Sequence, residues 1–549
     1  MKKLFKMIIC VLLIATFSFS AVGCSGGGED ETGAIVVKVF DGGYNVSWLD
    51  KIIKAFEDDT GINVVRRPEV TDTGSWVSEI QSGTTNVDIF FDCNSGLEFT
   101  MNSVVANGTT YQGMLADLTD MYNTKVPGED ILYKDKMIPA VREAYNFDYK
   151  YNPDTHEYYE ESTTGKYYTT SWANSALSFV VNMGSWDSSW GEFPNTTDEM
   201  FVWCEKVIAS NEGKGFGSRI YPFAYSLKNS YWDFVYTTWA YQYMGETEYN
   251  DYMNGYDKDG NRFTPELLLY DGFEKSLEVL QGCLLYRGTD GIDSYSHPYS
   301  LTIDFTTSQF YLLNGSAIAQ PNGNWLISEM VANYSNAADL DIQFKKIPVI
   351  SSIKDRCETI ADDAELSALI KSIDSGSSAL SGEGYDVSQE DYDRVYFARR
   401  YCETIGTGHG AYIPVYSDMT SEAKQFLLYM AKNSSLEIYY KETLGSSLPF
   451  NYDYSNSAFK SSKLIESEKT LIKSLDIKPY SIGTSKYRFF AKTGFNCFDM
   501  PYHINNSTET YLSAKNTKDR KDANAIFMAN YKYARDNWNA MYAAYSWAD

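Results

Sequence analysis

The sequence predicts an α/β fold in which strands and helices alternate along the chain. Three short runs of β-branched and apolar residues, at 35–40, 62–65 and 87–91, have the length and composition of buried strands. A helical pattern at 48–56 separates the first two runs. The chain has 549 residues, enough for two large domains or about three smaller ones at roughly 100 to 200 residues each. We therefore expect doubly wound α/β domains with sizeable cores.

The first helix is predicted by the spacing of its apolar residues. Trp48, Ile52, Ile53 and Phe56 recur at the interval of a helical turn and form one apolar face. Gly61 then marks the end of the helix, since glycine readily adopts the left-handed conformation found there. A strand, a helix and a strand in this order predict parallel pairing of the strands.

Two loops of this domain are positioned to meet a ligand. In doubly wound sheets, ligands bind beyond the carboxyl ends of the strands. The loops at 41–47 and 92–96 follow the first and third predicted strands. Their polar and aromatic side chains are therefore candidates for ligand contact.

The remainder of the chain continues the α/β pattern. Residues 176–182 read as a buried strand, and Thr196 with Glu199 forms a capping box at the start of the next helix. Small polar residues at 374–391 predict an exposed loop. The segment from about Ala523 onward places apolar residues on one side of a helix and predicts a docking helix.

The charge of the chain excludes some partners. It carries 47 Lys and Arg against 73 Asp and Glu, a net charge of -26. Phosphate backbones and anionic membrane surfaces would be repelled, so we expect no nucleic-acid partner. Aromatic residues make up 15% of the chain, and any one of them is therefore more often a core residue than a ligand contact.

The N-terminus predicts an exported, lipid-anchored protein. Lysines precede a short apolar run within residues 1–23, as in a signal peptide. Ala21-Val22-Gly23-Cys24 resembles the lipobox of bacterial lipoproteins, which implies lipidation of Cys24; an ordinary signal peptide with an incidental cysteine is the alternative. Residues 24–33 are rich in glycine and acidic residues and read as a flexible tether. Membrane contact is expected through the lipid only, because no later segment has about 18 uninterrupted apolar residues.

No metal or cofactor site is predicted. The cysteines are widely spaced, without Cys-x-x-Cys or a Cys/His cluster, so they read as buried thiols with a disulfide still possible. Residues 257–261 begin like a calcium loop, but Arg262 stands where that loop needs glycine. A turn is the better interpretation, and we expect no cofactor.

The order of motifs resembles the family 1 extracellular solute-binding proteins, the sugar-binding subunits of bacterial ABC importers. The resemblance covers most of the chain after Cys24, and each motif is weak by itself. The segments that carry it are Phe56–Val64, Val87–Phe91, Leu115–Thr119, Leu177–Asn182, Pro194–Met200, Phe310–Trp325 and Ala423–Met430. The chain is longer than most relatives, with extra residues mainly at 245–300, at 370–395 and beyond 455.

The resemblance implies a periplasmic-binding-protein-like fold with two α/β lobes, a hinge and a ligand cleft between the lobes. Lobe one is expected at 34–170 and 350–435, and lobe two at 171–349 and 436–549. It also implies a monomer outside the cytoplasm that captures a carbohydrate and delivers it to ABC transporter permease subunits, without being an enzyme.

The candidate ligand-binding residues follow from position and from the resemblance. Some lie on loops at strand ends or at the start of a helix, others precede the crossing strand, match aromatic cleft segments of the family or lie on a glycine-rich loop. They are Tyr44, Asn45, Trp76, Asp92, Asn94, Trp172, Asn174, Tyr231, Trp232, Asn324, Trp325 and His409.

Two other functions remain open at this stage. A secreted glycoside hydrolase would use a pair of carboxylates, but the acidic residues are scattered and no hydrolase motif is present. A ligand-sensing partner of a membrane receptor would use the same cleft as an importer subunit. The ligand itself is predicted to be a neutral oligosaccharide, because the cleft segments hold no arginine cluster for an anion and many aromatic residues for sugar rings.

Overall fold

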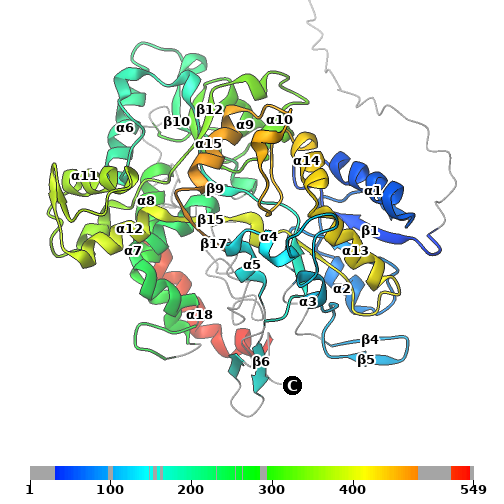
Figure 1. The fold of residues 1–549 in the computed structure, drawn as a ribbon. Coiled ribbons are helices and arrows are strands. Elements are labelled where there is room, and N and C mark those ends of the chain that lie inside the picture. Colours follow the sequence, from blue (N-terminus) through cyan, green and yellow to red (C-terminus); the bar gives the residue numbers. More distant parts are fainter. Residues whose placement is uncertain are drawn as a thin grey trace, which may run out of the picture.

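The computed structural model describes most of the chain after residue 30. The described residues are 31–94, 96, 103–146, 149–152, 157–160, 165–229, 231–253, 255–261, 264–284, 294–479 and 521–544. The predicted signal peptide, Cys24 and most of the tether lie outside them. The chain forms two α/β lobes, as predicted. Figure 1 shows α1 (Ser47–Thr60), α2 (Trp76–Gln81) and α13 (Thr420–Met430) on one side of the molecule, and α6 (Thr197–Ala209), α7 (Asp233–Met253) and α11 (Asp363–Asp374) on the other.

Lobe one, formed by the described residues within 31–172 and 406–450, is built around a five-stranded sheet of order β2-β1-β3-β16-β8. β1 pairs in parallel with β2 and β3, as the β-α-β order predicts, whereas β16 runs antiparallel to both of its neighbours. The strands are β1 (Ile35–Val39), β2 (Val64–Arg66), β3 (Ile89–Phe91), β8 (Thr169–Ser171) and β16 (Gly410–Tyr412).

The helices of lobe one bury their apolar faces in one core. In α1, the predicted residues Trp48, Ile52, Ile53 and Phe56 are all buried, and Gly61 ends the helix with a φ of 73°. The helices are α1 (Ser47–Thr60), α2 (Trp76–Gln81), α3 (Thr119–Tyr122), α4 (Tyr133–Lys136), α5 (Pro139–Tyr145), α13 (Thr420–Met430) and α14 (Asn433–Glu442). Two hairpins join β4 (Val104–Ala106) to β5 (Thr109–Tyr111) and β6 (Tyr149–Asn152) to β7 (Glu157–Glu160).

Lobe two, formed by the described residues within 176–404, 463–479 and 521–544, contains the second sheet, of order β10-β11-β9-β15-β17. Its central strand β9 has the predicted bounds Ala176–Asn182, is buried along its whole length and also pairs with β12. The other strands are β10 (Tyr221–Phe223), β11 (Ala317–Asn322), β12 (Ile342–Lys345), β15 (Tyr401–Thr404) and β17 (Asp476–Pro479).

Helices surround this second sheet. Thr196 caps α6 by accepting a hydrogen bond from the backbone of Glu199, as the capping box predicts. The C-terminal helix α18 packs on α8, which confirms the predicted docking helix. The helices are α6 (Thr197–Ala209), α7 (Asp233–Met253), α8 (Asp271–Leu284), α9 (Phe305–Leu313), α10 (Leu326–Met330), α11 (Asp363–Asp374), α12 (Gln389–Arg400), α15 (Lys463–Ile472) and α18 (Ala523–Ala544).

Short elements complete both lobes. A two-stranded hairpin, β13 (Ser381–Gly382) with β14 (Tyr385–Asp386), lies in the segment predicted as a loop. Asp257 accepts hydrogen bonds from the backbone of Asp259 and Asn261, so this segment forms the expected turn. The 3-10 helices span Met183–Ser185, Ser188–Trp190, Phe216–Ser218, Leu227–Asn229, Pro265–Leu269, Ala337–Asp339, Ser351–Arg356, Ile405–Thr407 and Tyr454–Asn456.

The packing differs from the expected lobe boundaries. Residues 350–401 were expected in lobe one, but buried side chains such as Ile353, Leu369 and Val395 belong to the core of lobe two. Residues 436–450 were expected in lobe two, but Tyr439 packs in the core of lobe one. The apolar faces of α11 and α12 fix this arrangement, because they are buried against lobe-two elements.

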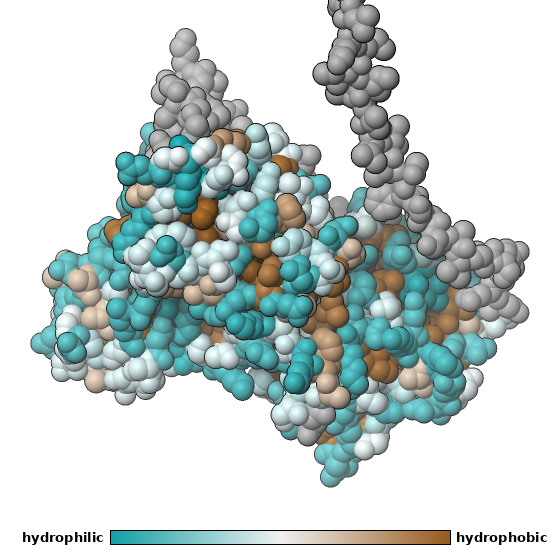
Figure 2. Space-filling model, turned by 90° about the horizontal axis from the view of Figure 1, so that it is seen from above, coloured by the Kyte–Doolittle hydropathy of each residue, from teal (hydrophilic) through white to brown (hydrophobic). Residues whose placement is uncertain are grey.

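The surface agrees with the acidic composition. Figure 2 shows one face of the molecule, which is mostly hydrophilic with scattered apolar patches. Within the part of the chain that the structure describes, we find no helical segment with the length and apolar character needed to traverse a lipid bilayer.

Candidate functional site

Three segments pass between the lobes, and predicted site residues lie on two of them. Residues 172–175 connect β8 to β9, and residues 405–409 connect β15 to β16. The third connection, between α14 and α15, pairs Ser447 with Asn174 of the first. Trp172, Asn174 and His409 therefore lie at the hinge between the two sheets.

Aromatic residues of both lobes meet at this hinge. The ring of Tyr44, on the loop after β1, lies 6.2 Å from Trp172 and 6.5 Å from His409. It also lies 6.4 Å from Trp325 of lobe two, which in turn contacts Phe234 at 5.6 Å. Residues from distant parts of the sequence thus form one aromatic cluster between the lobes.

Asn324 connects both lobes through its hydrogen bonds. Its Oδ1 accepts the Tyr44 hydroxyl at 3.0 Å, and its Nδ2 donates to the carbonyl of Asn174 at 3.0 Å. Its backbone amide donates to Ser175 Oγ at 2.9 Å, and Nδ2 also donates to Glu468 at 2.9 Å. Asn324 therefore fixes the position of Tyr44 relative to the first crossing segment.

Glu468 is a site-adjacent residue that the sequence did not single out. It projects from α15 and accepts hydrogen bonds from the backbone of Ala176 at 2.9 Å and from Ser175 Oγ at 3.1 Å. Burial raises its pKa to about 7, although these hydrogen bonds favour the charged form. A buried carboxyl group therefore holds the start of β9 at the hinge.

Glu468 predicts a pH dependence of stability. Its folded pKa of about 7 lies above the unfolded value near 4.3, so the folded state holds more protons between these values and stability falls as pH rises through them. Between pH 5 and pH 8 we expect the ionisation of Glu468 to lower the free energy of unfolding by about 2 to 3 kcal/mol. Urea unfolding at both pH values measures the free energy of unfolding. Between them, this free energy should fall less for Glu468→Gln than for the unchanged protein. Glu466→Gln, exposed on the same helix, is the control, and equal losses in all three proteins would contradict the assignment.

A second carboxyl group lies where α10 approaches the loop after β1. Glu329 Oε2 accepts a hydrogen bond from Gln309 Nε2 at 2.5 Å, and the same nitrogen donates to the Tyr231 hydroxyl at 3.1 Å. A Cβ atom on Gly43 would lie 2.5 Å from Glu329 Oε1, so glycine is required for this close approach between the lobes. Burial raises the pKa of Glu329 to about 8, and the nearby charge of Asp41 adds to the shift.

His409 is uncharged in this environment. Its ring lies 5.2 Å from that of Trp172, and burial lowers its pKa to about 4. Its Nδ1 atom has no hydrogen-bond partner among the residues that the structure describes. A neutral imidazole of this kind can donate or accept one hydrogen bond to a ligand.

Two predicted residues lie outside the aromatic cluster, and one of them contacts it through Trp172. Asp92 is buried, its carbonyl accepts Trp172 Nε1 at 2.7 Å, and its carboxylate accepts the Tyr412 hydroxyl at 2.5 Å. Asn94 is exposed and its Nδ2 lies 3.3 Å from Asp92 Oδ1. Asp92 therefore orients Trp172, and neither residue lies in the aromatic cluster.

Two predicted residues at the beginnings of helices lie away from the site. Asn45 is exposed, accepts a hydrogen bond from the backbone of Ser47 at the start of α1 and donates to the carbonyl of Glu442. Trp76 is buried against Phe90 at 5.2 Å, in the core of lobe one. Both positions follow from local structure, because each residue lies at the beginning of a helix.

Trp232 is a core residue of lobe two, contrary to its predicted ligand contact. Its side chain is fully buried, and its ring lies 5.4 Å from Phe223, 6.1 Å from Phe179 and 6.2 Å from Trp239. The neighbouring Tyr231 points instead toward Gln309 and the lobe interface. Consecutive residues at the start of α7 thus face opposite sides.

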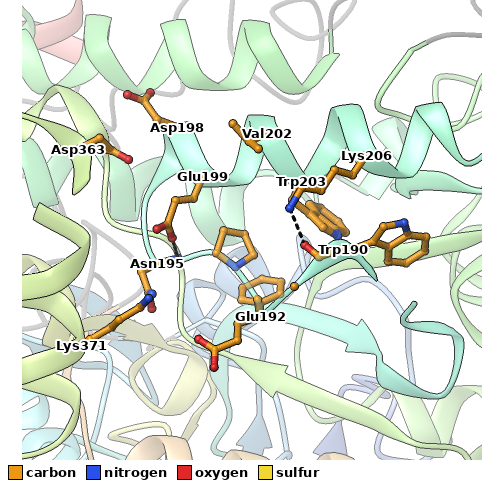
Figure 3. Close-up of a pocket in the computed structure, with 13 residues that line it drawn as sticks. Trp190, Glu192, Asn195, Asp198, Glu199, Val202, Trp203, Lys206, Asp363 and Lys371 are labelled. Carbon is orange, nitrogen blue, oxygen red and sulfur yellow. Dashed lines mark hydrogen bonds between the residues drawn. The ribbon is translucent and has the colours of Figure 1, made fainter. Parts of the chain in front are cut away.

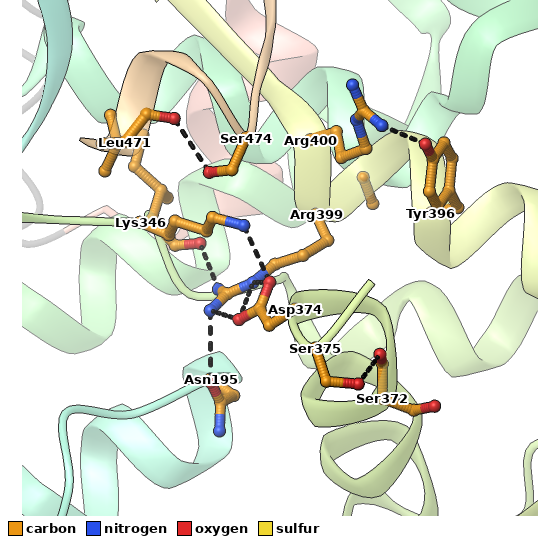
Figure 4. A network of polar contacts seen from close by, with 12 residues as sticks. Asn195, Lys346, Ser372, Asp374, Ser375, Tyr396, Arg399, Arg400, Leu471 and Ser474 are labelled. Atoms are coloured by element: carbon orange, nitrogen blue, oxygen red, sulfur yellow. Dashed lines mark hydrogen bonds and ion pairs between the residues drawn. The ribbon is translucent and has the colours of Figure 1, made fainter. Parts of the chain in front are cut away.

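Surface hollows on lobe two are separate from this site. One hollow of about 340 Å³ lies beside α6, and in Figure 3 Lys206 donates to the carbonyl of Trp190 at its edge. A second, of about 710 Å³, lies beside α15, near the network of Figure 4 in which Arg399 and Lys346 pair with Asp374. These ion pairs join α11, α12 and the end of β12, and each charged group in them has a partner of opposite charge.

Comparisons with known proteins identify structural neighbours. No protein-family model matches the chain, and no curated protein matches it. The GacH receptor of Streptomyces glaucescens GLA.O, solved unliganded and with acarbose and an acarbose homolog, superposes with a TM-score of 0.54 at 11% identity, covering 92% of this chain and 98% of that chain. SBP RafE in complex with raffinose superposes with a TM-score of 0.52 at 13% identity, covering 91% and 99%. At these identities the likeness establishes a shared fold.

Proposed function

We propose that this chain, which has the fold of two-lobed solute-binding proteins, captures a carbohydrate between its lobes and delivers it to an ABC transporter permease. The observation that carries the proposal is the aromatic cluster at the hinge, to which lobe one contributes Tyr44 and Trp172 and lobe two contributes Trp325. GacH was solved with acarbose and RafE with raffinose, and both ligands are carbohydrates.

The chemistry of the site favours an oligosaccharide without anionic groups. Aromatic rings offer apolar faces to sugar rings, and Tyr231, His409 and the backbone around Gly43 offer hydrogen bonds to hydroxyl groups. Glu329 and Glu468 would repel an anionic ligand if ionised. A hinge between the lobes allows them to close on the ligand, as in other two-lobed binding proteins.

We propose binding without turnover. The test is a thermal-shift screen of residues 31–549 against mono- and oligosaccharides, both neutral and amino-substituted, with chromatography of each sugar afterwards. A ligand that binds only the folded state raises the melting temperature, so a clear shift with the sugar intact is expected. Cleavage of the sugar would replace the proposal with a hydrolase, and a folded protein with no shift for any sugar would contradict carbohydrate capture.

We also propose that the protein is held at the outer face of the cell membrane through Cys24. Cys24→Ser should move the protein from the membrane fraction to the soluble fraction, because the acyl chains attached there would hold it in the membrane. Fractionation followed by immunoblotting measures this, with Cys93→Ser as the matched control. Membrane association of the Cys24→Ser variant would contradict the lipobox assignment.

A further inference from the structure

One corner of the inter-lobe site has an unusual concentration of hydrogen-bond acceptors. Asp41, Gly43 and Glu329 are half-buried there, where α10 of lobe two meets the loop after β1. Among the described residues, no lysine or arginine forms an ion pair with Asp41 or Glu329, and the charges acting on their pKa values are those of other carboxylates. Two carboxyl groups therefore share one corner without a cation.

A buried amide oxygen in the same corner has no hydrogen-bond donor as its partner. Gln309 is fully buried and donates its Nε2 to Glu329 and to Tyr231. Its Oε1 has no hydrogen-bond partner among the described residues. An unpaired buried acceptor costs free energy, so Oε1, on the same amide group whose Nε2 contacts Glu329, favours a ligand that donates hydrogen bonds.

Aromatic rings line the same corner. Tyr231 lies 5.3 Å from Phe234, and Phe234 lies 5.6 Å from Trp325. The faces of such rings attract cations as well as sugar faces. Carboxylates, an unpaired amide oxygen and aromatic rings together make an environment suited to a small cationic group.

We infer that this corner recognises a protonated amino group on one ring of the captured saccharide, with Glu329 as its main partner and Asp41 and Gln309 Oε1 as further acceptors. The inference rests on the proposed function, because the amine is a substituent of the sugar. An ammonium group has three donors and a charge, so it satisfies this set of acceptors better than a hydroxyl group, which has one donor. Its charge also favours the ionised form of Glu329, whose pKa burial otherwise raises.

The experiment compares sugars that differ only in an amino or hydroxyl group. The pairs are glucosamine with glucose, galactosamine with galactose, and the fully deacetylated chitosan trimer with cellotriose, each titrated calorimetrically at pH 7. We expect at least one amine to bind about tenfold or more tightly than its hydroxyl partner, a difference of about 1.4 kcal/mol. In Glu329→Gln this advantage should disappear, because the neutral amide offers no charge to the ammonium group, although it can still accept the hydrogen bond from Gln309.

The controls separate this inference from the proposed function. Glu212→Gln removes the same charge from an exposed position of lobe two and should keep the preference for the amine. Equal or tighter binding of the hydroxyl sugar in every pair, or an amine preference that survives Glu329→Gln, would overturn the inference and leave carbohydrate capture intact. Absence of binding by every sugar, neutral or amine, would overturn both.

Discussion

Replacing Trp232 with alanine should destabilise lobe two by about 3 to 5 kcal/mol, the usual cost of removing a large buried aromatic side chain. The side chain of Trp232 is fully buried, and its ring lies against Phe223, Tyr225 and Phe179. Few neighbours can move into the space it leaves, since the surrounding rings already pack against one another. Urea unfolding monitored by circular dichroism measures the change.

Sugar binding separates this core role from the ligand contact that the sequence suggested. Trp232→Phe keeps an aromatic ring in the core and should retain most of the stability. Under conditions where both variants are folded, their affinity for a sugar should stay close to that of the unchanged protein. If Trp232→Ala keeps full stability and loses affinity, Trp232 is a ligand contact and its placement in the core is wrong.

Replacing Trp325 with alanine should weaken sugar binding by about tenfold or more, equivalent to at least about 1.4 kcal/mol. Its ring lies between Tyr44 of lobe one and Phe234 of lobe two, where an aromatic surface can stack on a sugar and link the lobes around it. The loss of stability should be smaller than for Trp232→Ala, because the Trp325 ring borders the lobe interface. Calorimetric titration gives the affinity.

Trp325→Phe is the matched control for this variant. It preserves an aromatic face at the same position and should recover most of the affinity. Unchanged binding by Trp325→Ala, in a protein that binds sugar, would remove Trp325 from the site and with it the main lobe-two contribution to the aromatic cluster.

Much of the fold could be predicted because local patterns determine it. The alternation of strands and helices, the bounds of β9 and the capping of α6 by Thr196 all follow from periodicity and short-range hydrogen bonding. The lobe boundaries could not be predicted in the same way. The apolar faces of α11 and α12 show which sides are buried, but the pattern does not tell against which lobe they pack.

Only part of the candidate site could be proposed from the sequence. Tyr44, Trp172 and Trp325, which the structure brings together, were proposed because they lie at strand ends and crossing segments, and ligands bind at strand ends in open α/β sheets. Glu329 and Glu468 were missed among 73 acidic residues. A signal for Glu468 exists, since it occupies the apolar face of α15 between Leu464 and Leu471, where a charged residue is unexpected.

The polar contacts between the lobes could not be predicted from local sequence patterns. Gln309 and Glu329 lie on separate helices, and Gly43 comes from the other lobe. Their contact depends on how the two sheets are joined at the hinge, and no short pattern in the sequence encodes that. Long-range packing thus determines the chemical character of the site more than residue type does.

The most direct test of ligand capture between the lobes is hydrogen–deuterium exchange with and without a sugar that raises the melting temperature. Binding between the lobes should slow exchange at residues 41–45, 172–176, 323–329 and 405–409, because backbone amides of both lobes and of the hinge become shielded. Protection confined to the hollow beside α6, at 190–206 and 363–371, with no change at the hinge, would contradict the account.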